Sequence, residues 1–248
     1  MTVMRAIVSK SAGLEGLVLA QRDVPRPGPG EVLLRMRAAS VALRDYKMAT
    51  GAYASGTVHA ARVLGGEGVG EVLELGAGVT QWRVGDRVNP LFVQRWTGAR
   101  AHPEAIARST LGGPEIDGSF ADHMRVPAES LVAVPAHLSD AEAATLPFAG
   151  LTAWCAVREQ GGIAVGVGAG DVVVVQGTGG IPLFALQFAK LAGARVIVPR
   201  RTTTSWPVPA RSAPTTRSTT RPCRSGRLQC STSPRAAAPT WCSTPAAR

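Results

Sequence analysis

The residues whose types and spacing best suit chemistry form one glycine-rich turn and the position after it: Gly177, Thr178, Gly179, Gly180 and Ile181. Glycine permits a tight turn and lets backbone N–H groups come close to a pyrophosphate, and a helix that begins there adds partial positive charge. The turn therefore indicates a site for a dinucleotide cofactor. Pro182 stands where the G-x-G-x-x-G pattern has its third glycine, so an ordinary strand-to-helix turn stays open as the alternative.

The segments around this turn predict the elements that position it. Asp171–Gln176 is a β-branched run typical of a parallel strand that is buried on both faces. Ile181–Leu191 reads as a helix and Arg195–Val198 as the next strand, which completes a βαβ unit. Upstream, Ser139-Asp140-Ala141-Glu142 is a capping box that opens a helix, and Leu151–Arg158 is a second helical stretch.

The residues before Ser139 follow a different sequence pattern, in which short apolar runs are separated by Gly and Pro. The expected strands are Arg5–Val8, Leu17–Leu19, Glu31–Arg37, Val69–Leu75 and Arg87–Val93. Short strands with this punctuation predict a compact, β-rich, barrel-like domain.

The net charge of +10 invites a nucleic-acid-binding interpretation, but its distribution along the chain argues against one. Nine of the 27 basic residues, all of them Arg, lie in residues 199–248, which contain no Asp or Glu. The rest of the chain is nearly neutral, with 18 basic and 17 acidic residues. Residues 199–248 also hold 8 Pro and 17 Ser or Thr without a period of 2 or 3.6, so we expect a disordered tail there.

Cysteine spacing and hydropathy narrow the class of protein further. Cys155 stands alone in the body of the chain, whereas Cys223, Cys230 and Cys242 lie in the tail at spacings that fit no zinc module. No apolar run approaches the roughly 20 residues that span a bilayer, and the first residues lack the pattern of a signal peptide. We expect a cytoplasmic protein with no membrane and no nucleic-acid partner.

Several motifs, taken together in their order along the chain, resemble those of the medium-chain dehydrogenase/reductase superfamily, in its zinc-independent, quinone-oxidoreductase-like branch. Together with the glycine turn, the segments that carry this resemblance are Val24–Leu33, Ala39–Tyr46, Leu64–Gly70, Val84–Val88 and Leu146–Trp154. The first four resemble the family patterns P-x-P-x-x-G-E-V-L, A-x-S-L-N-x-R-D, x-G-x-E-G-x-G and V-G-D-R-V, and Leu146–Trp154 and the glycine turn complete the set. The resemblance covers about residues 4–198.

This resemblance implies an α/β protein with a β-rich domain. A GroES-like β-barrel, the catalytic domain, would cover residues 1–138, and an incomplete Rossmann domain, a doubly wound parallel sheet, would cover residues 139–198. A cofactor cleft would separate the two, and the tail at 199–248 would stand outside the fold. The implied activity is hydride transfer from NAD(P)H, with NADP(H) favoured over NAD(H), to a quinone, an enone or a similar small carbonyl substrate. A homodimer of the full-length family member stays open.

The same resemblance speaks against zinc. In zinc-using relatives the metal ligands would fall at Ala42, Gly66 and Phe148, none of which can ligate a metal. Without a Lewis acid, reduction of an activated acceptor is the more plausible chemistry, because positioning the nicotinamide against an electrophilic carbon can suffice.

Individual site residues are harder to assign. Thr152 aligns with a family residue near the nicotinamide, or else it bonds back within its own helix. Asp45 and Tyr46 are candidates for an acid or a polar contact, although Asp45 and Glu67 also suit structural roles, and no residue is assigned as the general acid. Two other functions stay open: a catalytically silent nucleotide-binding family member, and a nucleic-acid-binding protein that uses its Arg-rich tail.

The tail invites a genetic explanation. Joining the third base of each codon to the first two of the next permits a continuation from Ser205 that contains LGADHTIDY and GADLVLDTGG, which suits a Rossmann domain. We hypothesise one frame change near Val198–Arg200, in the gene or in its sequencing. The shifted loop begins with Ser or Thr rather than an acid, which favours NADP(H). Because the written chain would lack further strands, we expect poor stability and little activity from it.

Sequencing of the DNA across the codons for Ile197–Arg201 tests the frame hypothesis. We expect a change of one or two bases to open a long frame that encodes the shifted sequence. The mass of the expressed protein distinguishes the two sources, because a mass of 25.7 kDa places the change in the gene itself. Absence of any long alternative frame would contradict the hypothesis.

Overall fold

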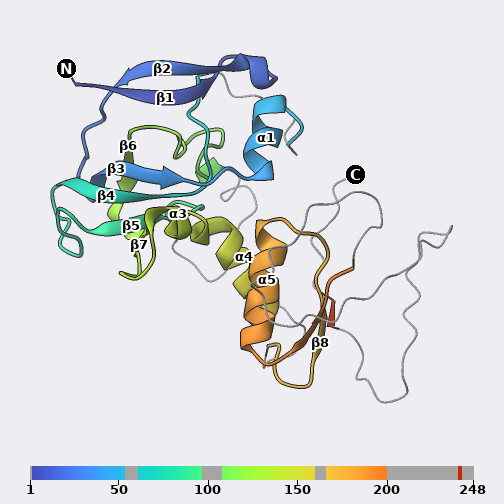
Figure 1. Ribbon diagram of the computed structural model, residues 1–248. Helices are drawn as coiled ribbons and strands as arrows, with labels where there is room; N and C mark the ends of the chain where they lie inside the picture. The colour runs from blue at the N-terminus through green and yellow to red at the C-terminus, as the bar shows by residue number, and fades with distance from the viewer. Residues whose placement is uncertain (1, 54–60, 97–107, 160–165, 200–239, 242–248) are drawn as a thin grey trace. The chain divides into compact units, whose positions relative to one another are not determined.

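The computed structural model describes residues 2–53, 61–96, 108–159, 166–199 and 240–241. The chain divides into two compact units, Met1–Phe148 and Ala149–Arg248 (Figure 1). The division falls later than the boundary at Ser139 expected from the sequence. The reason is packing: the short helix α3 (Asp140–Ala143) belongs to the first unit, where Ala143 is buried against Val69.

The first unit is built on a five-stranded antiparallel sheet. Its strand order is β6 (His123–Pro127), β3 (Glu31–Ala39), β4 (Gly68–Leu75), β5 (Arg87–Pro90) and β7 (Leu131–Ala133). Val32, Leu34, Val72 and Val88 are fully buried on these strands and form the centre of the core. The β-rich domain predicted from short apolar runs is therefore confirmed. Strand β5 ends earlier than predicted, at Pro90, which has no N–H to extend the ladder.

A hairpin and a helix complete the frame of this unit. The hairpin pairs β1 (Val3–Ser9) with β2 (Leu17–Asp23), and between them lies the short 3-10 helix η1 (Leu14–Gly16). Figure 1 shows the hairpin as a layer separate from the five-stranded sheet, with α1 (Leu43–Thr50) beside both. A second 3-10 helix, η2 (Ala128–Ser130), joins β6 to β7.

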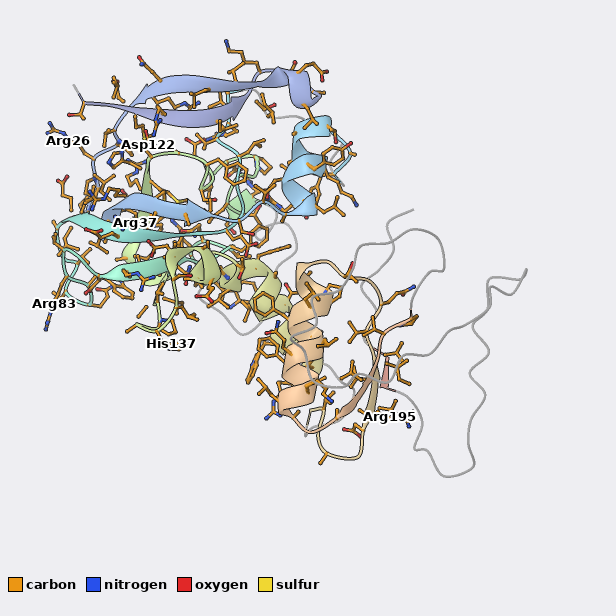
Figure 2. All side chains as sticks on the ribbon, in the orientation of Figure 1. Arg26, Arg37, Arg83, Asp122, His137 and Arg195 are labelled. Atoms are coloured by element: carbon orange, nitrogen blue, oxygen red, sulfur yellow. The ribbon has the colours of Figure 1, made fainter. Side chains whose placement is uncertain are left out.

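Polar contacts fasten α3 to the sheet. The capping box predicted at Ser139 is confirmed: the Ser139 Oγ accepts from the Glu142 N–H at 3.3 Å, and a Glu142 carboxylate oxygen accepts from the Ser139 N–H at 2.9 Å. Asp140 lies 2.7 Å from an Arg87 nitrogen and 3.3 Å from Arg37, which is labelled in Figure 2. The Arg87 guanidinium, by hydrogen bonding, lowers the pKa of the Asp140 carboxyl.

Asn89 makes the buried contact at this junction. Its side-chain amide donates to the Gly68 carbonyl at 2.7 Å and to the Ala143 carbonyl at 3.0 Å. Asn89 is buried on β5, so one side chain joins β4, β5 and the end of α3. The segment that follows α3 leads directly to Phe148, and Asn89 thereby helps to position it.

The second unit holds the predicted βαβ arrangement. Strands β8 (Val172–Val174) and β9 (Arg195–Ile197) pair in parallel, and α5 (Gly180–Leu191) connects them. Ala185 and Ala189 of α5 are buried in one cluster with residues of both strands. Arg195, labelled in Figure 2, begins β9.

The helical stretch predicted at Leu151–Arg158 is confirmed as two successive helical segments, and a third segment precedes it. They are the π-helix η3 (Leu146–Gly150), α4 (Leu151–Trp154) and the π-helix η4 (Cys155–Glu159). Ala153 and Val157 are its buried residues in the cluster beneath α5. Among the described residues, every helix is too short or too polar to cross a lipid bilayer.

The tail contributes one short strand to the second unit. Strand β10 (Thr240–Trp241) pairs in parallel with β8, on the side opposite β9. The expectation of a tail without structure is wrong at these two residues. The physical reason is the free edge of β8, whose backbone groups accept a partner strand of almost any sequence.

Replacement of Asn89 by Ala tests the junction between β4, β5 and α3. We expect the free energy of unfolding to fall by about 2 kcal/mol, because two buried carbonyls lose their donor. Urea unfolding followed by circular dichroism measures the change. The control is Gln21→Ala on the exposed face of β2, which we expect to stay within about 0.5 kcal/mol of the original chain. Equal stabilities of the Asn89 and Gln21 variants would contradict this role.

Candidate functional site

The start of α1 carries two buried charges side by side. The side chains of Arg44 and Asp45 are 6% and 4% exposed. Both lie on the face of α1 that also buries Met48 and Ala49, which pack against Leu64. A helical face that holds positions i, i+1, i+4 and i+5 explains why two charged residues enter the interior together.

Asp45 fixes the local backbone. Its carboxylate accepts from the Ala42 N–H at 2.8 Å, and it also accepts from the backbone of Gly66 and from its own N–H. One carboxylate thus joins the first turn of α1 to the loop before β4. Burial raises the pKa of the Asp45 carboxyl, while these backbone hydrogen bonds and the charge of Arg44 oppose the rise.

Aromatic rings and small residues surround Arg44. The centre of its guanidinium lies 4.8 Å from the Phe92 ring centroid and 5.4 Å from that of Tyr53. Its Nη2 lies 3.4 Å from the Thr110 hydroxyl. Its Nη1 is the atom nearest to the place a Cβ of Gly66 would take, at 3.3 Å. A side chain at position 66 would therefore come too close to the Arg44 guanidinium.

The structure brings together the three positions at which zinc-using relatives carry ligands. Asp45 joins Ala42 to Gly66, and the Phe148 N–H donates to the Glu67 carboxylate at 3.0 Å. The rings of Phe92 and Phe148 meet edge to face at 4.8 Å.

The chemistry of these side chains does not suit a metal. A methyl group, a hydrogen atom and a phenyl ring supply no nitrogen, oxygen or sulfur ligand. In the part of the chain that the structure describes, no three His, Cys, Asp or Glu side chains gather in a way that could hold a metal ion. Ala42, Gly66 and Phe148 therefore do not fit the zinc site that the family resemblance implies.

The structure places Asp45 and Tyr46, the two candidate catalytic residues from the sequence, in different environments. Asp45 points inward and holds backbone, whereas Tyr46 is 51% exposed. Sequence reasoning missed Arg44, although the helical spacing of Met48 and Ala49 already placed it on the apolar face. A projection of residues 43–50 around a helix axis would have found it.

In the second unit, the predicted glycine turn lies between β8 and α5, and residues 176–180 are exposed. Gly177 has φ 93°, a conformation that favours glycine. A Cβ on Gly180 would lie 3.3 Å from that of Ala149, so Gly180 allows close packing. Thr178 is exposed in the turn, Ile181 packs partly into the cluster under α5, and Thr152 is exposed on α4.

Gly179 is the glycine that the fold does not require. Its backbone is extended, with φ −75° and ψ −179°, a conformation open to any residue. A Cβ there would meet only the Pro182 ring, at 3.9 Å. No side chain caps the N-terminus of the 12-residue helix α5 at this point. A bare N-terminus with room for close approach suits an anionic group such as a pyrophosphate.

Known proteins share much of this architecture. Residues 28–136 match the family of alcohol dehydrogenase GroES-like domains. The chain is 36% identical over 199 residues to the acryloyl-coenzyme A reductase of Metallosphaera sedula, with 78% of this chain and 58% of that protein covered. It is also 36% identical over 199 residues to a zinc-type alcohol dehydrogenase-like protein of Schizosaccharomyces pombe, with 80% and 56% covered.

A solved structure extends the likeness to three dimensions. The quinone oxidoreductase from Coxiella burnetii superposes with a TM-score of 0.66 at 28% identity, and the match covers 81% of this chain and 57% of that one. The chain thus spans less than two thirds of the length of these relatives.

The raised pKa of Asp45 predicts a pH-dependent effect of Asp45→Asn. The native state of the original chain holds the Asp45 proton more tightly than the unfolded state does, so its stability falls as pH rises above the ordinary value of 3.8. The Asn variant lacks this loss. Its free energy of unfolding, relative to the original chain, should therefore rise with pH.

Urea unfolding of both proteins between about pH 2 and pH 8, a range that brackets the ordinary carboxyl pKa, measures this difference. Asp140→Asn is the matched control of opposite sign. The lowered pKa of Asp140 stabilises the original chain as pH rises, so the relative stability of that variant should fall. The same slope for both variants would contradict the assignment at Asp45.

Proposed function

The chain belongs to the alcohol dehydrogenase and medium-chain dehydrogenase/reductase superfamily, and on that premise we propose that it is an NADP(H)-dependent oxidoreductase that works without zinc. Its reaction is hydride transfer to a conjugated carbonyl acceptor, a quinone or an enone. The observation that carries the proposal is the open glycine turn at the N-terminus of α5.

The three glycines of the turn support binding of a dinucleotide because each has a different reason to be glycine. Gly177 allows the turn, Gly180 allows close packing, and Gly179 leaves room without any need of the fold. These are the roles that glycines play around a pyrophosphate in Rossmann domains. Thr178 and Ile181 would add backbone contacts from the same turn, and Thr152 is the candidate neighbour of the nicotinamide. When bound, the cofactor supplies the hydride.

The preference for NADP(H) rests on the residues after β9. An acidic residue beyond the second strand of such a unit typically binds the free ribose hydroxyl of NAD(H). The written chain has no Asp or Glu after Val198, and the hypothesised alternative frame begins its loop with Ser or Thr. Both sequences favour a 2′-phosphate over a free hydroxyl.

The acceptor class follows from the chemistry around Arg44 and from the names of two relatives. Ala42, Gly66 and Phe148 offer no metal ligands, so the acceptor must be reactive enough for hydride transfer without a Lewis acid. An acryloyl thioester and a quinone, named for relatives in Metallosphaera sedula and Coxiella burnetii, are both conjugated carbonyl compounds. We therefore extend that class of acceptor to this chain.

Replacement of Gly179 by Ala tests the cofactor site. Because the fold leaves space for a methyl group there, we expect the variant to unfold at the same temperature as the original chain. The affinity for NADPH should fall roughly tenfold, or about 1.4 kcal/mol, because the methyl group obstructs close approach of the pyrophosphate. Isothermal titration of the 248-residue chain with NADPH and with NADH measures both affinity and preference.

Gly168→Ala is the matched control, since that glycine lies in the same unit with nothing within 4 Å of its would-be Cβ. It should leave NADPH binding unchanged. Equal NADPH affinity in the Gly179 variant and the original chain would contradict the site. Loss of NADPH oxidation by the frame-restored protein after treatment with a zinc chelator would contradict the metal-free mechanism. NADPH binding by the frame-restored protein without oxidation of any acceptor would identify a silent family member.

A further inference from the structure

Arg44 is a buried cation with unused hydrogen-bond donors. A guanidinium carries five N–H donors. Among the described residues, neither Nε nor Nη1 of Arg44 has a hydrogen-bond partner. Burying such donors without acceptors costs free energy, and service to a ligand is one explanation for a group that bears this cost.

The charge of Arg44 is also incompletely balanced. Its nearest carboxylate oxygen, on Asp45, lies 3.8 Å from Nη1, beyond hydrogen-bond distance. The Asp45 oxygens are engaged instead by backbone N–H groups of Ala42, Gly66 and Asp45 itself. The remaining positive charge can attract an oxygen atom that bears negative charge.

The aromatic rings around the Arg44 guanidinium favour one kind of ligand. Tyr53 and Phe92 hold their rings close to the guanidinium, and the Phe148 ring meets that of Phe92. Tyr53 is 39% exposed, and Phe92 and Phe148 are half-buried, so these rings are accessible from outside. A flat conjugated molecule stacks well on such rings, whereas a small hydrated anion gains little from them.

We propose that Arg44 binds the carbonyl oxygen of the acceptor and stabilises the negative charge that this oxygen gains during reduction. The inference rests on the proposed function, because it assigns a site for the acceptor of that reaction. A conjugated π bond of the acceptor breaks as the acceptor gains a hydride with its two electrons from NADPH, which is oxidised to NADP⁺. The charge comes to rest on the oxygen as an enolate or a phenolate, and a proton from water then neutralises the product.

A fixed guanidinium suits this task. A guanidinium pairs well with an oxygen atom that bears negative charge, and Nη1 of Arg44 has no hydrogen-bond partner among the described residues. Low local polarity strengthens its attraction for a developing oxyanion. Because the charge exists before the acceptor binds, no reorganisation is needed during hydride transfer.

The test uses 4-nitrophenol, whose ionised form is a coloured phenolate that mimics the reduced acceptor. Absorbance titration of the 248-residue chain measures both its affinity and the pKa of the bound phenol. We expect the original chain to bind the phenolate and to lower its pKa. Arg44→Met, which preserves length and apolar volume, should weaken phenolate binding at least roughly tenfold and abolish the pKa change.

Stability and binding are measured separately for each variant. Arg44→Met leaves the buried Asp45 carboxylate without its neighbouring cation, so its unfolding temperature should fall, and adding Asp45→Asn to that variant should recover much of the loss. Phenolate binding is therefore measured well below the unfolding temperature of every variant. Arg44→Lys keeps the charge but loses the fork, and should bind the phenolate more weakly than the original chain. Arg35→Met on β3 is the control, because Arg35 pairs with Glu71 on the exposed side of the sheet.

Phenolate binding that is unchanged in both Arg44 variants would overturn the proposal. So would phenolate binding by Arg44→Met that equals that of Arg35→Met at a temperature where both variants are folded, which would show an arginine with a structural role alone. Phenolate binding that depends on Arg44 in a chain that fails to bind NADPH would support the oxyanion site and refute the proposed function. Undiminished NADPH oxidation in Arg44→Met would do the reverse.

Discussion

The hydrogen bonds from backbone N–H groups to Asp45 are the constraint on which the first unit's candidate site depends. One carboxylate holds the first turn of α1 against the loop before β4, and so determines where Ala42, Arg44 and Gly66 stand. Gly65 makes this loop feasible, since it has φ 105° and a Cβ there would lie 2.5 Å from the Ser119 hydroxyl. The arrangement thus needs a buried acid in the helix and a glycine in the loop.

From the other side, α3 and the segment after it bring Phe148 to the same place. Asn89 and the Arg37, Arg87 and Asp140 cluster fasten α3 to the sheet, and the Glu67 carboxylate accepts from the Phe148 N–H. Residues far apart in the chain therefore meet through polar contacts, of which those of Asn89 are buried. Apolar packing alone would hold α3 and the segment after it less specifically against the sheet.

Local sequence patterns predicted most of the fold and little of the first unit's site. The S-x-x-E pattern at Ser139 and the β-branched run before Gly177 act over a few residues, so each could be read directly and each was confirmed as an element. The burial of Arg44 could be inferred only by placing it on the helical face of Met48. Its aromatic neighbours Tyr53 and Phe92 come from separate segments and had no local signature. The pairing of Thr240–Trp241 with β8 could not be predicted, because backbone pairing at a free edge leaves no mark in the side chains.

The proposed role of the buried Arg44 guanidinium has a consequence for how the charge of such a site would be supplied. A metal centre must be filled after folding, competes with other cations for its occupant, and can be emptied. An arginine side chain is covalently part of every copy of the chain and does not exchange with the solvent as a metal ion does. The positive charge of Arg44 is therefore part of the polypeptide itself, so its presence would not depend on the supply of metal in the cell.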